Sequence, residues 1–169
     1  MDLLSLALLC GPLVDPETTL RVINVESGES ATAIHDNTSG ESYLRLSAEE
    51  AARTAERLIR AGHRIDLGLM QINYGKWLSK SSFSVREALD PCTNIRLGTS
   101  ILSAEYARAL SHSRTLHEAL QFALSAYHSG SETRSPGYAD RVFLVRPRVA
   151  MSVPHDQTET LAKNHVIPR

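Results

Sequence analysis

Long apolar runs, basic stripes and closely spaced cysteine pairs of the CxxC type are all missing from this sequence of 169 residues. No apolar run is long enough to span a bilayer, so no transmembrane segment is expected. Basic and acidic residues number 18 and 19, and the basic ones form no stripe, so no nucleic-acid partner is expected. The sequence holds no CxxC or HExxH motif, and we therefore expect neither a metal ion nor another cofactor.

The beginning of the chain lacks the usual features of a secretory signal. Residues 3–9 (LLSLALL) are apolar, but Asp2 is the only early charge, the first basic residue is Arg21, and no small-x-small cleavage site follows. We predict that this stretch is the first helix of the domain. Cys10 is either a buried thiol or the disulfide partner of Cys92, and the sequence leaves both possibilities open.

Strand signals are few, whereas signals for helix starts and stops are frequent. Capping residues and Gly or Pro stops predict further helices at residues 16–26, 47–62, 90–110, 115–130 and 135–147. At most one short extended piece is expected, within residues 37–46. The expected core side of the helix that begins at residue 90 comprises Ile95, Leu97, Ile101, Leu102 and Ala107. We interpret residues 1–147 as one mainly helical domain and residues 148–169 as a polar, flexible tail.

Four segments stand out once these helices are placed. In order along the chain they read NVESG (24–28), DLGLMQIN (66–73), SAYHSG (125–130) and GYADRV (137–142). Their order and separations resemble the lysozyme-like lytic transglycosylase domain, in the VirB1-type branch that accompanies type IV secretion and conjugation systems. The resemblance implies a mainly α fold of the goose-type lysozyme and SLT kind, with a glycan-binding groove.

The same resemblance implies cleavage of the β-1,4 bond between N-acetylmuramic acid and N-acetylglucosamine in peptidoglycan. In that family no water enters, because the sugar's own 6-hydroxyl attacks its anomeric carbon and leaves a 1,6-anhydro end. The leaving oxygen needs a protonated acid, and burial in apolar surroundings favours the protonated form of a carboxyl group. Glu26, at the end of an apolar helical turn, is the candidate acid, and it would then take the proton of the attacking hydroxyl.

The remaining site residues also follow from the resemblance. It implies that the hydroxyl of Tyr138 reaches Glu26, which makes Tyr138 the second catalytic candidate. Met70 is expected to pack against the sugar, and Gln71 to hydrogen-bond to an acetamido or hydroxyl group. His128 stands where the family pattern has Asn, and an imidazole cannot reproduce an amide's paired donor and acceptor. The full set of substrate-binding candidates is Ser27, Met70, Gln71, Asn73, Tyr127 and His128.

Other residues near these motifs have more than one interpretation. A hydrolase would use a second carboxylate beside the acid. We interpret Glu29 and Glu41 as loop charges, and Asp66 as a brace or cap for the turn that follows it. Asn73 binds the glycan or caps the next segment, and Trp77 stacks on a sugar or plugs the surface.

The sequence therefore favours a lytic transglycosylase that opens the wall locally for a secretion or conjugation machine. Its expected partners are peptidoglycan glycan strands and components of such a machine. Because peptidoglycan lies outside the inner membrane, the expected location is the bacterial periplasm or cell envelope. Two alternatives remain open: a lysozyme-type hydrolase of the same glycan, and a wall-binding assembly factor with weak or no turnover.

Overall fold

The computed structural model describes residues 1–146, which form seven α-helices, one short 3-10 helix and four short strands. The prediction of a mainly helical fold is confirmed. The predicted tail, residues 148–169, lies outside the described residues. The chain divides into two compact units: residues 1–25 with the chain from residue 99 onward, and residues 26–98. Both Cys10 and Cys92 are disulfide-bonded, so the buried-thiol alternative is wrong.

The helices begin where the capping residues of the sequence predict, except for the short α4, which was not predicted. Their bounds are α1 Leu3–Cys10, α2 Pro16–Ser27, α3 Ala48–Arg60, α4 Val85–Ala88, α5 Pro91–Leu110, α6 Leu116–Ser129 and α7 Pro136–Leu144. The Asp15 carboxylate accepts hydrogen bonds from the backbone N–H groups of Glu17 and Thr18, and Ser47 with Glu50 forms the predicted capping box. The apolar stretch at residues 3–9 is helical, as predicted.

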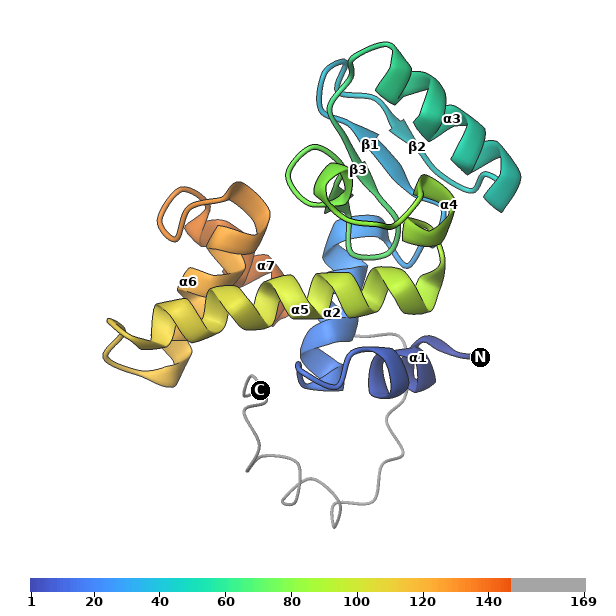
Figure 1. Cartoon of the computed structure of the whole chain (residues 1–169). Helices are drawn as coiled ribbons and strands as arrows, with labels where there is room; N and C mark the ends of the chain where they lie inside the picture. Colours follow the sequence, from blue (N-terminus) through green and yellow to red (C-terminus); the bar gives the residue numbers. More distant parts are fainter. Residues whose placement is uncertain (147–169) are drawn as a thin grey trace. The chain divides into compact units, whose positions relative to one another are not determined.

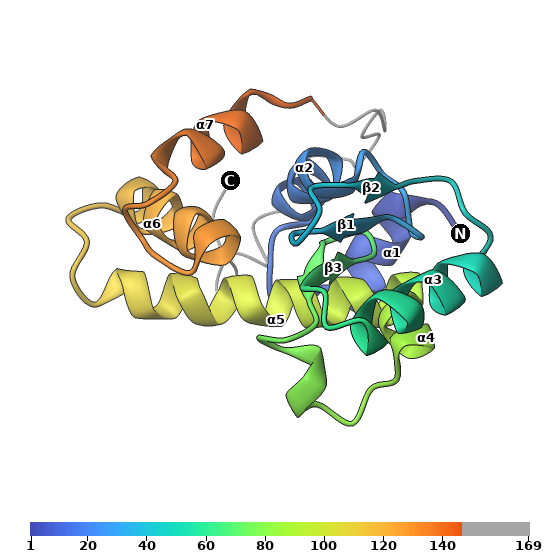
Figure 2. The same cartoon turned by 90° about the horizontal axis from the view of Figure 1, so that it is seen from above.

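In the unit that contains α6 and α7, these two helices pack against each other (Figure 2). Ala119, Ala123 and Ala126 of α6 are fully buried, and such small residues let a neighbouring helix approach closely. Gly130 ends α6 in the left-handed conformation that the αL C-cap requires, with φ +75°. At the other end of α6, Thr115 accepts from the N–H of Glu118, which confirms half of the predicted capping box. The Glu118 carboxylate instead accepts from the N–H of Arg114.

The unit of residues 26–98 contains an antiparallel sheet that the sequence analysis did not predict (Figure 1). Its strands are β1 Ile34–Asp36, β2 Ser42–Tyr43, β3 Ile65–Leu67 and β4 Ile72–Asn73, in the order β2-β1-β3-β4. α3 packs against β1 and β3. Only β2 lies within the extended piece expected in residues 37–46. Strands of two or three residues are too short for an alternating pattern to be recognised, which explains the error.

The core side of α5 differs from the prediction at two positions. Leu97 is only half-buried. Ile95, Ile101 and Leu102 are buried, as predicted, whereas Ala107 is exposed and the prediction for it is wrong. Tyr106 and Ala109 are buried instead. They lie four and seven residues after Leu102, the spacing at which side chains share one face of a helix.

Candidate active site

A row of polar side chains crosses the sheet of residues 26–98. His35 of β1 pairs with Ser42 of β2 and with Asp66 of β3, and Asp66 in turn pairs with Asn73 of β4. The flanking positions in β1 and β3 are buried, whereas His35 and Asp66 are only half-buried. Since side chains alternate between the faces of a sheet, this row lies on the less buried face. His35 Nδ1 lies 2.9 Å from Ser42 Oγ, which continues the row to the edge strand.

Asp66 is the centre of this row, and both of its carboxylate oxygens accept hydrogen bonds. Asn37 Nδ2 lies 2.8 Å from Oδ2, and Asn73 Nδ2 lies 2.6 Å from Oδ1. Partial burial raises the pKa of Asp66 above its ordinary value, the two amide donors lower it, and the electrostatic interaction with the Glu26 carboxyl group raises it again. These contacts support the interpretation of Asp66 as a brace, and its carboxyl group also interacts electrostatically with Glu26.

Glu26 lies in the last turn of α2, where the chain leaves the helix. Its side chain is half-buried, and the following Ser27 is buried. The next two residues, Gly28 and Glu29, have φ values of +58° and +71°. Glycine adopts left-handed backbone readily, whereas glutamate rarely does, so the turn after α2 is strained at Glu29. This turn directs the chain from Glu26 towards the first strand of the sheet.

The segment GLMQ forms a tight turn between β3 and β4, and Gln71 in it has φ +47°. Gln71 Nε2 donates to the carbonyl oxygens of Gly68 at 2.8 Å and Ala33 at 3.2 Å. Because both partners are acceptors, the amide orientation is fixed and both of its hydrogens are used. A ligand would therefore meet Gln71 as a hydrogen-bond acceptor, through Oε1.

Asn73 has the same kind of internal role at the end of the turn. Its Nδ2 donates to Asp66, and its Oδ1 accepts from the backbone N–H of Lys76 at 2.8 Å. The interpretation of Asn73 as a cap for the following segment is confirmed. The next aromatic residue, Trp77, is 36% exposed, and the Lys76 ammonium lies 4.8 Å from its ring centroid.

Met70 lies in the interior of the unit, whereas the resemblance implies that it contacts the sugar. Its side chain has no exposed surface, so in this conformation it packs inside the unit. A Cβ atom at Gly98 of α5 would lie 2.4 Å from Met70 Sδ, and one at Gly68 would lie 2.3 Å from Asn94 Nδ2. The two glycines allow α5 to pack closely under the turn, which fixes the position of Gln71 from below.

Asn94 of α5 supports the same turn, and sequence reasoning missed it. Its side chain is fully buried. Its Oδ1 accepts from the N–H of Met70 at 2.7 Å, and its Nδ2 donates to the carbonyls of Leu67 at 2.9 Å and Ala88 at 2.8 Å. The available signal was a polar residue on the apolar face of a predicted helix, because a buried amide must find partners.

A second buried polar group stabilises the end of β1. Asp36 is fully buried and accepts from Ser39 Oγ at 2.7 Å and from the Thr38 N–H at 2.9 Å, and its Oδ2 lies 2.6 Å from His63 Nδ1. Burial alone would raise the pKa of Asp36, but the hydrogen bonds from Ser39 and His63 outweigh it and hold that pKa well below its ordinary value. These contacts join the loop after β1 to the segment that enters β3, which keeps the two strands of the polar row in register.

The remaining predicted site residues belong to the other unit. Tyr127 is half-buried and His128 is exposed, both in the last turn of α6, while Tyr138 in the first turn of α7 is 1% exposed. The rings of His128 and Tyr138 are stacked, with centroids 4.4 Å apart and an interplanar angle of 8°. Glu26, Ser27, Met70, Gln71 and Asn73 all fall within residues 26–98.

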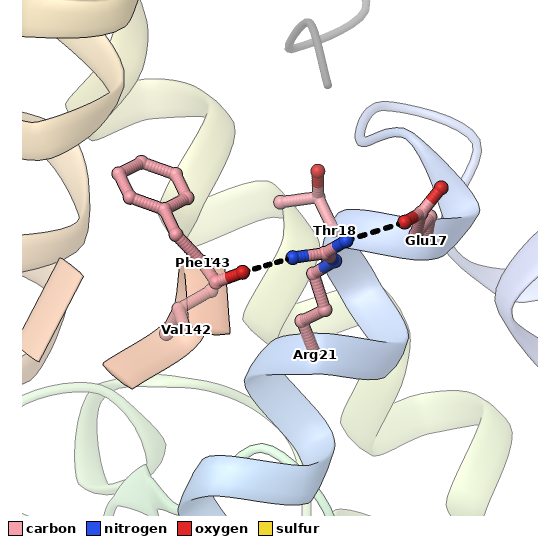
Figure 3. Close-up of a pocket in the computed structure, with 5 residues that line it drawn as sticks. All are labelled: Glu17, Thr18, Arg21, Val142 and Phe143. Carbon is pink, nitrogen blue, oxygen red and sulfur yellow. Dashed lines mark hydrogen bonds and ion pairs between the residues drawn. The ribbon is translucent and has the colours of Figure 1, made fainter. Parts of the chain in front are cut away.

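A small notch in the unit of α6 and α7 is lined by none of the predicted site residues (Figure 3). It is lined by Glu17, Thr18, Arg21, Val142 and Phe143. The Arg21 guanidinium lies between the Glu17 carboxylate, at 2.6 Å, and the backbone carbonyl of Phe143, to which it donates. Arginine thereby satisfies a carbonyl in the last turn of α7, so we interpret the notch as a structural contact between α2 and α7.

The comparisons with known proteins identify the family. Residues 7–136 match the family model of the transglycosylase SLT domain. The chain belongs to the transglycosylase SLT domain family. The lysozyme-like, mainly α fold that the four motifs predicted is therefore confirmed.

Two relatives show which branch of the family this SLT domain resembles. It is 33% identical over 135 residues to the protein virB1 of Agrobacterium fabrum, a match that covers 79% of this chain and 54% of that protein. It is 34% identical over 149 residues to the type IV secretion system protein virB1 of Brucella abortus, with 82% and 61% of the two chains covered. The resemblance to VirB1-type proteins is confirmed, and this chain spans little more than half the length of these relatives. No solved structure matches it significantly.

Residues 1–146 add two observations about this SLT domain. None of their helices combines the length and the apolar character that a membrane crossing requires. Within the same residues, no three His, Cys, Asp or Glu side chains gather in a group that could bind a metal ion.

Proposed function

We propose that this chain is a peptidoglycan lytic transglycosylase that cleaves the β-1,4 bond between N-acetylmuramic acid and N-acetylglucosamine and forms 1,6-anhydro ends. It would act in the periplasm or cell envelope and open the wall locally while a type IV secretion system assembles. The SLT match and the virB1 relatives support the reaction class and the setting. The observation that carries the proposal is the position of Glu26 within the matched residues, at a helix exit and in electrostatic range of the polar row on the sheet.

The proposed reaction needs one carboxyl group in two successive roles. Glu26 first donates its proton to the glycosidic oxygen, and the bond between that oxygen and the anomeric carbon breaks. The 6-hydroxyl of the same sugar then bonds to the anomeric carbon, and its proton passes to the Glu26 carboxylate. Glu26 ends in the protonated form in which it began, and no water is consumed. Tyr138 has the role that the family pattern gives it, with its hydroxyl directed at Glu26.

The neighbours of Glu26 have distinct parts in this proposal. Gln71 accepts a hydrogen bond from a sugar hydroxyl or acetamido N–H, because its own hydrogens are used within the turn. Asn73 acts through Asp66, to which it donates, and Met70 shapes the turn from the interior. Ser27 and Tyr127 complete the proposed set of residues along the glycan, and the last candidate, His128, stands where the family pattern has Asn.

The decisive test is the chemistry of the product. Purified peptidoglycan is digested in water enriched in oxygen-18, and the released muropeptides are analysed by mass spectrometry. We expect 1,6-anhydro ends without incorporated label, because the attacking oxygen belongs to the sugar. Labelled reducing ends would contradict the transglycosylase reaction and establish hydrolysis instead. Binding without any release would favour a wall-binding assembly factor.

A hydrolase is the second candidate, and Asp66 is the observation that favours it. A lysozyme-type hydrolase needs a second carboxylate near its acid, and Asp66 interacts electrostatically with Glu26. Its two amide partners hold it as a rigid acceptor, which suits either a brace or a carboxylate that stabilises positive charge on the sugar.

The variant Asp66→Asn separates these two roles. An amide in place of the carboxylate can accept only one of the two amide hydrogen bonds, so the turn loosens by roughly one hydrogen bond to a charged group. We expect kcat to fall about tenfold with the anhydro product unchanged. Glu41→Gln, which removes an exposed loop carboxylate of the same unit, is the control and is expected to stay within about twofold of wild type. A loss as severe as that of Glu26→Gln would mean that Asp66 takes part in the chemistry.

A further inference from the structure

The rings of His128 and Tyr138 are stacked, and His128 is the clearest departure of this chain from the family pattern. The two ring centroids lie 4.4 Å apart and the ring planes are within 8° of parallel. Tyr138 is 1% exposed, whereas His128 is exposed. The imidazole therefore presents its face to the buried tyrosine and only its outer side to solvent.

The loop between α6 and α7 holds the two helices together through its own hydrogen bonds, independently of the two rings. Ser125 Oγ donates to the carbonyl of Ser131 at 2.8 Å and accepts from the N–H of Ser135 at 3.0 Å. Ser129 Oγ also lies 3.0 Å from the Ser131 carbonyl. Gly130 adds the left-handed turn that ends α6. The hydroxyls thus hold the end of α6 beside the start of α7, so a change of the His128 side chain should leave the helix pair folded.

A cation also contacts the tyrosine ring. The guanidinium carbon of Arg141, one turn further along α7, lies 5.4 Å from the Tyr138 ring centroid. Tyr138 is therefore contacted by an aromatic ring from α6 and by a cation from its own helix. Offset and stacked aromatic contacts restrict the rotation of both rings. When the ring of a tyrosine is held in place, the position of its hydroxyl oxygen and the directions open to its O–H bond are fixed as well.

We propose that His128 is a positioning residue that fixes the ring of Tyr138 and acts on the reaction through it, in place of the glycan hydrogen bond that an amide would make at this position. This role rests on the proposed function, in which the Tyr138 hydroxyl acts at Glu26. An asparagine side chain has no ring, so it could not make the stacked contact that His128 makes with Tyr138.

Three substitutions of His128 test this role. His128→Phe keeps a flat ring without nitrogen atoms, His128→Ala removes the ring, and His128→Asn restores the residue of the family pattern. We expect His128→Phe to keep kcat within about threefold of wild type. We expect His128→Ala and His128→Asn to lower kcat about tenfold, with KM changed by less than about twofold. A residue that binds glycan directly would instead change KM, and phenylalanine would fail as badly as alanine.

An NMR measurement, which requires no turnover, accompanies the kinetics. The ring protons of Tyr138, in protein labelled at its five tyrosines and assigned by comparison with Tyr138→Phe, should carry the ring-current shift of the neighbouring aromatic ring. The shift should persist in His128→Phe and disappear in His128→Ala, whose remaining spectrum should stay that of a folded protein. An unchanged Tyr138 signal in His128→Ala would overturn the proposal, as would full activity of that variant.

The outcomes also distinguish this role from the proposed function. If the wild-type protein releases anhydro muropeptides but His128→Phe loses as much activity as His128→Ala, only the positioning role is overturned. A wild-type protein without glycan cleavage would overturn the proposed function, and the positioning role would fall with it.

Discussion

Glu26→Gln is expected to abolish release of muropeptides from purified peptidoglycan, with a loss in kcat of about a thousandfold. Glutamine keeps the size of the side chain and its place at the exit of α2, but it has no proton to give to the glycosidic oxygen. It also cannot take the proton of the 6-hydroxyl in the second step. Both halves of the proposed reaction fail together, so little activity should survive at any pH. Turnover is measured by quantifying anhydro muropeptides over time.

The matched control is Glu29→Gln, the same substitution three residues further along the chain. Glu29 lies in the turn after α2, and glutamine should adopt its left-handed backbone as readily as glutamate does. Activity within about twofold of wild type is expected for the control. If Glu26→Gln kept more than about a tenth of the wild-type rate while folded, Glu26 would not be the acid and the proposed mechanism would be wrong.

Asn94→Ala should cause the largest loss of stability among single changes near the site. It removes the partner of three buried backbone groups: the N–H of Met70 and the carbonyls of Leu67 and Ala88. Leaving a buried polar group without a partner costs about 1–3 kcal/mol, so we expect the free energy of unfolding to fall by about 3–5 kcal/mol. Urea unfolding followed by the fluorescence of Trp77, the single tryptophan of the chain, measures it in the same unit.

Ser103→Ala on the same helix is the control for the change in helix propensity. Ser103 is half-buried, and its replacement is expected to alter the free energy of unfolding by less than about 0.5 kcal/mol. If Asn94→Ala unfolded at the same urea concentration as Ser103→Ala, the amide would not be essential to the turn. The position of Gln71 would then depend on the packing of Gly98 and Met70 alone.

The helices of this fold could be predicted because their boundaries are encoded locally. Pro16 after Asp15, the Ser47 and Glu50 capping box, and Gly130 act on backbone groups within four residues of themselves. The sheet could not be predicted, because its strands are short and its pairs join distant parts of the chain. Asp36, for example, pairs with Ile65, and the loop bonds that hold them depend on His63.

The candidate site also contains some residues that a local motif indicates and others whose position depends on distant parts of the chain. The motifs supplied Glu26 and Gln71 as candidates, and the position of Asp66 before Gly68 indicated a brace. The burial of Met70 could not be predicted, because it depends on Gly98, a small residue on a helix 28 positions later in the numbering of the chain. The contribution of Asn94 depends in the same way on which face of α5 lies under the turn. A local motif thus indicates candidate residues better than it indicates the residues that hold them in place.

The shortness of the sheet has a consequence for association between copies of the chain. β2 and β4 are its two edge strands, and each is only two residues long. A strand from another molecule needs a continuous series of free N–H and C=O groups to pair with, and two residues offer too few. The shortness of the two edge strands thus opposes edge-to-edge aggregation, although neither strand contains a lysine or a proline. The sheet can keep its polar face open and still resist growth through its own backbone.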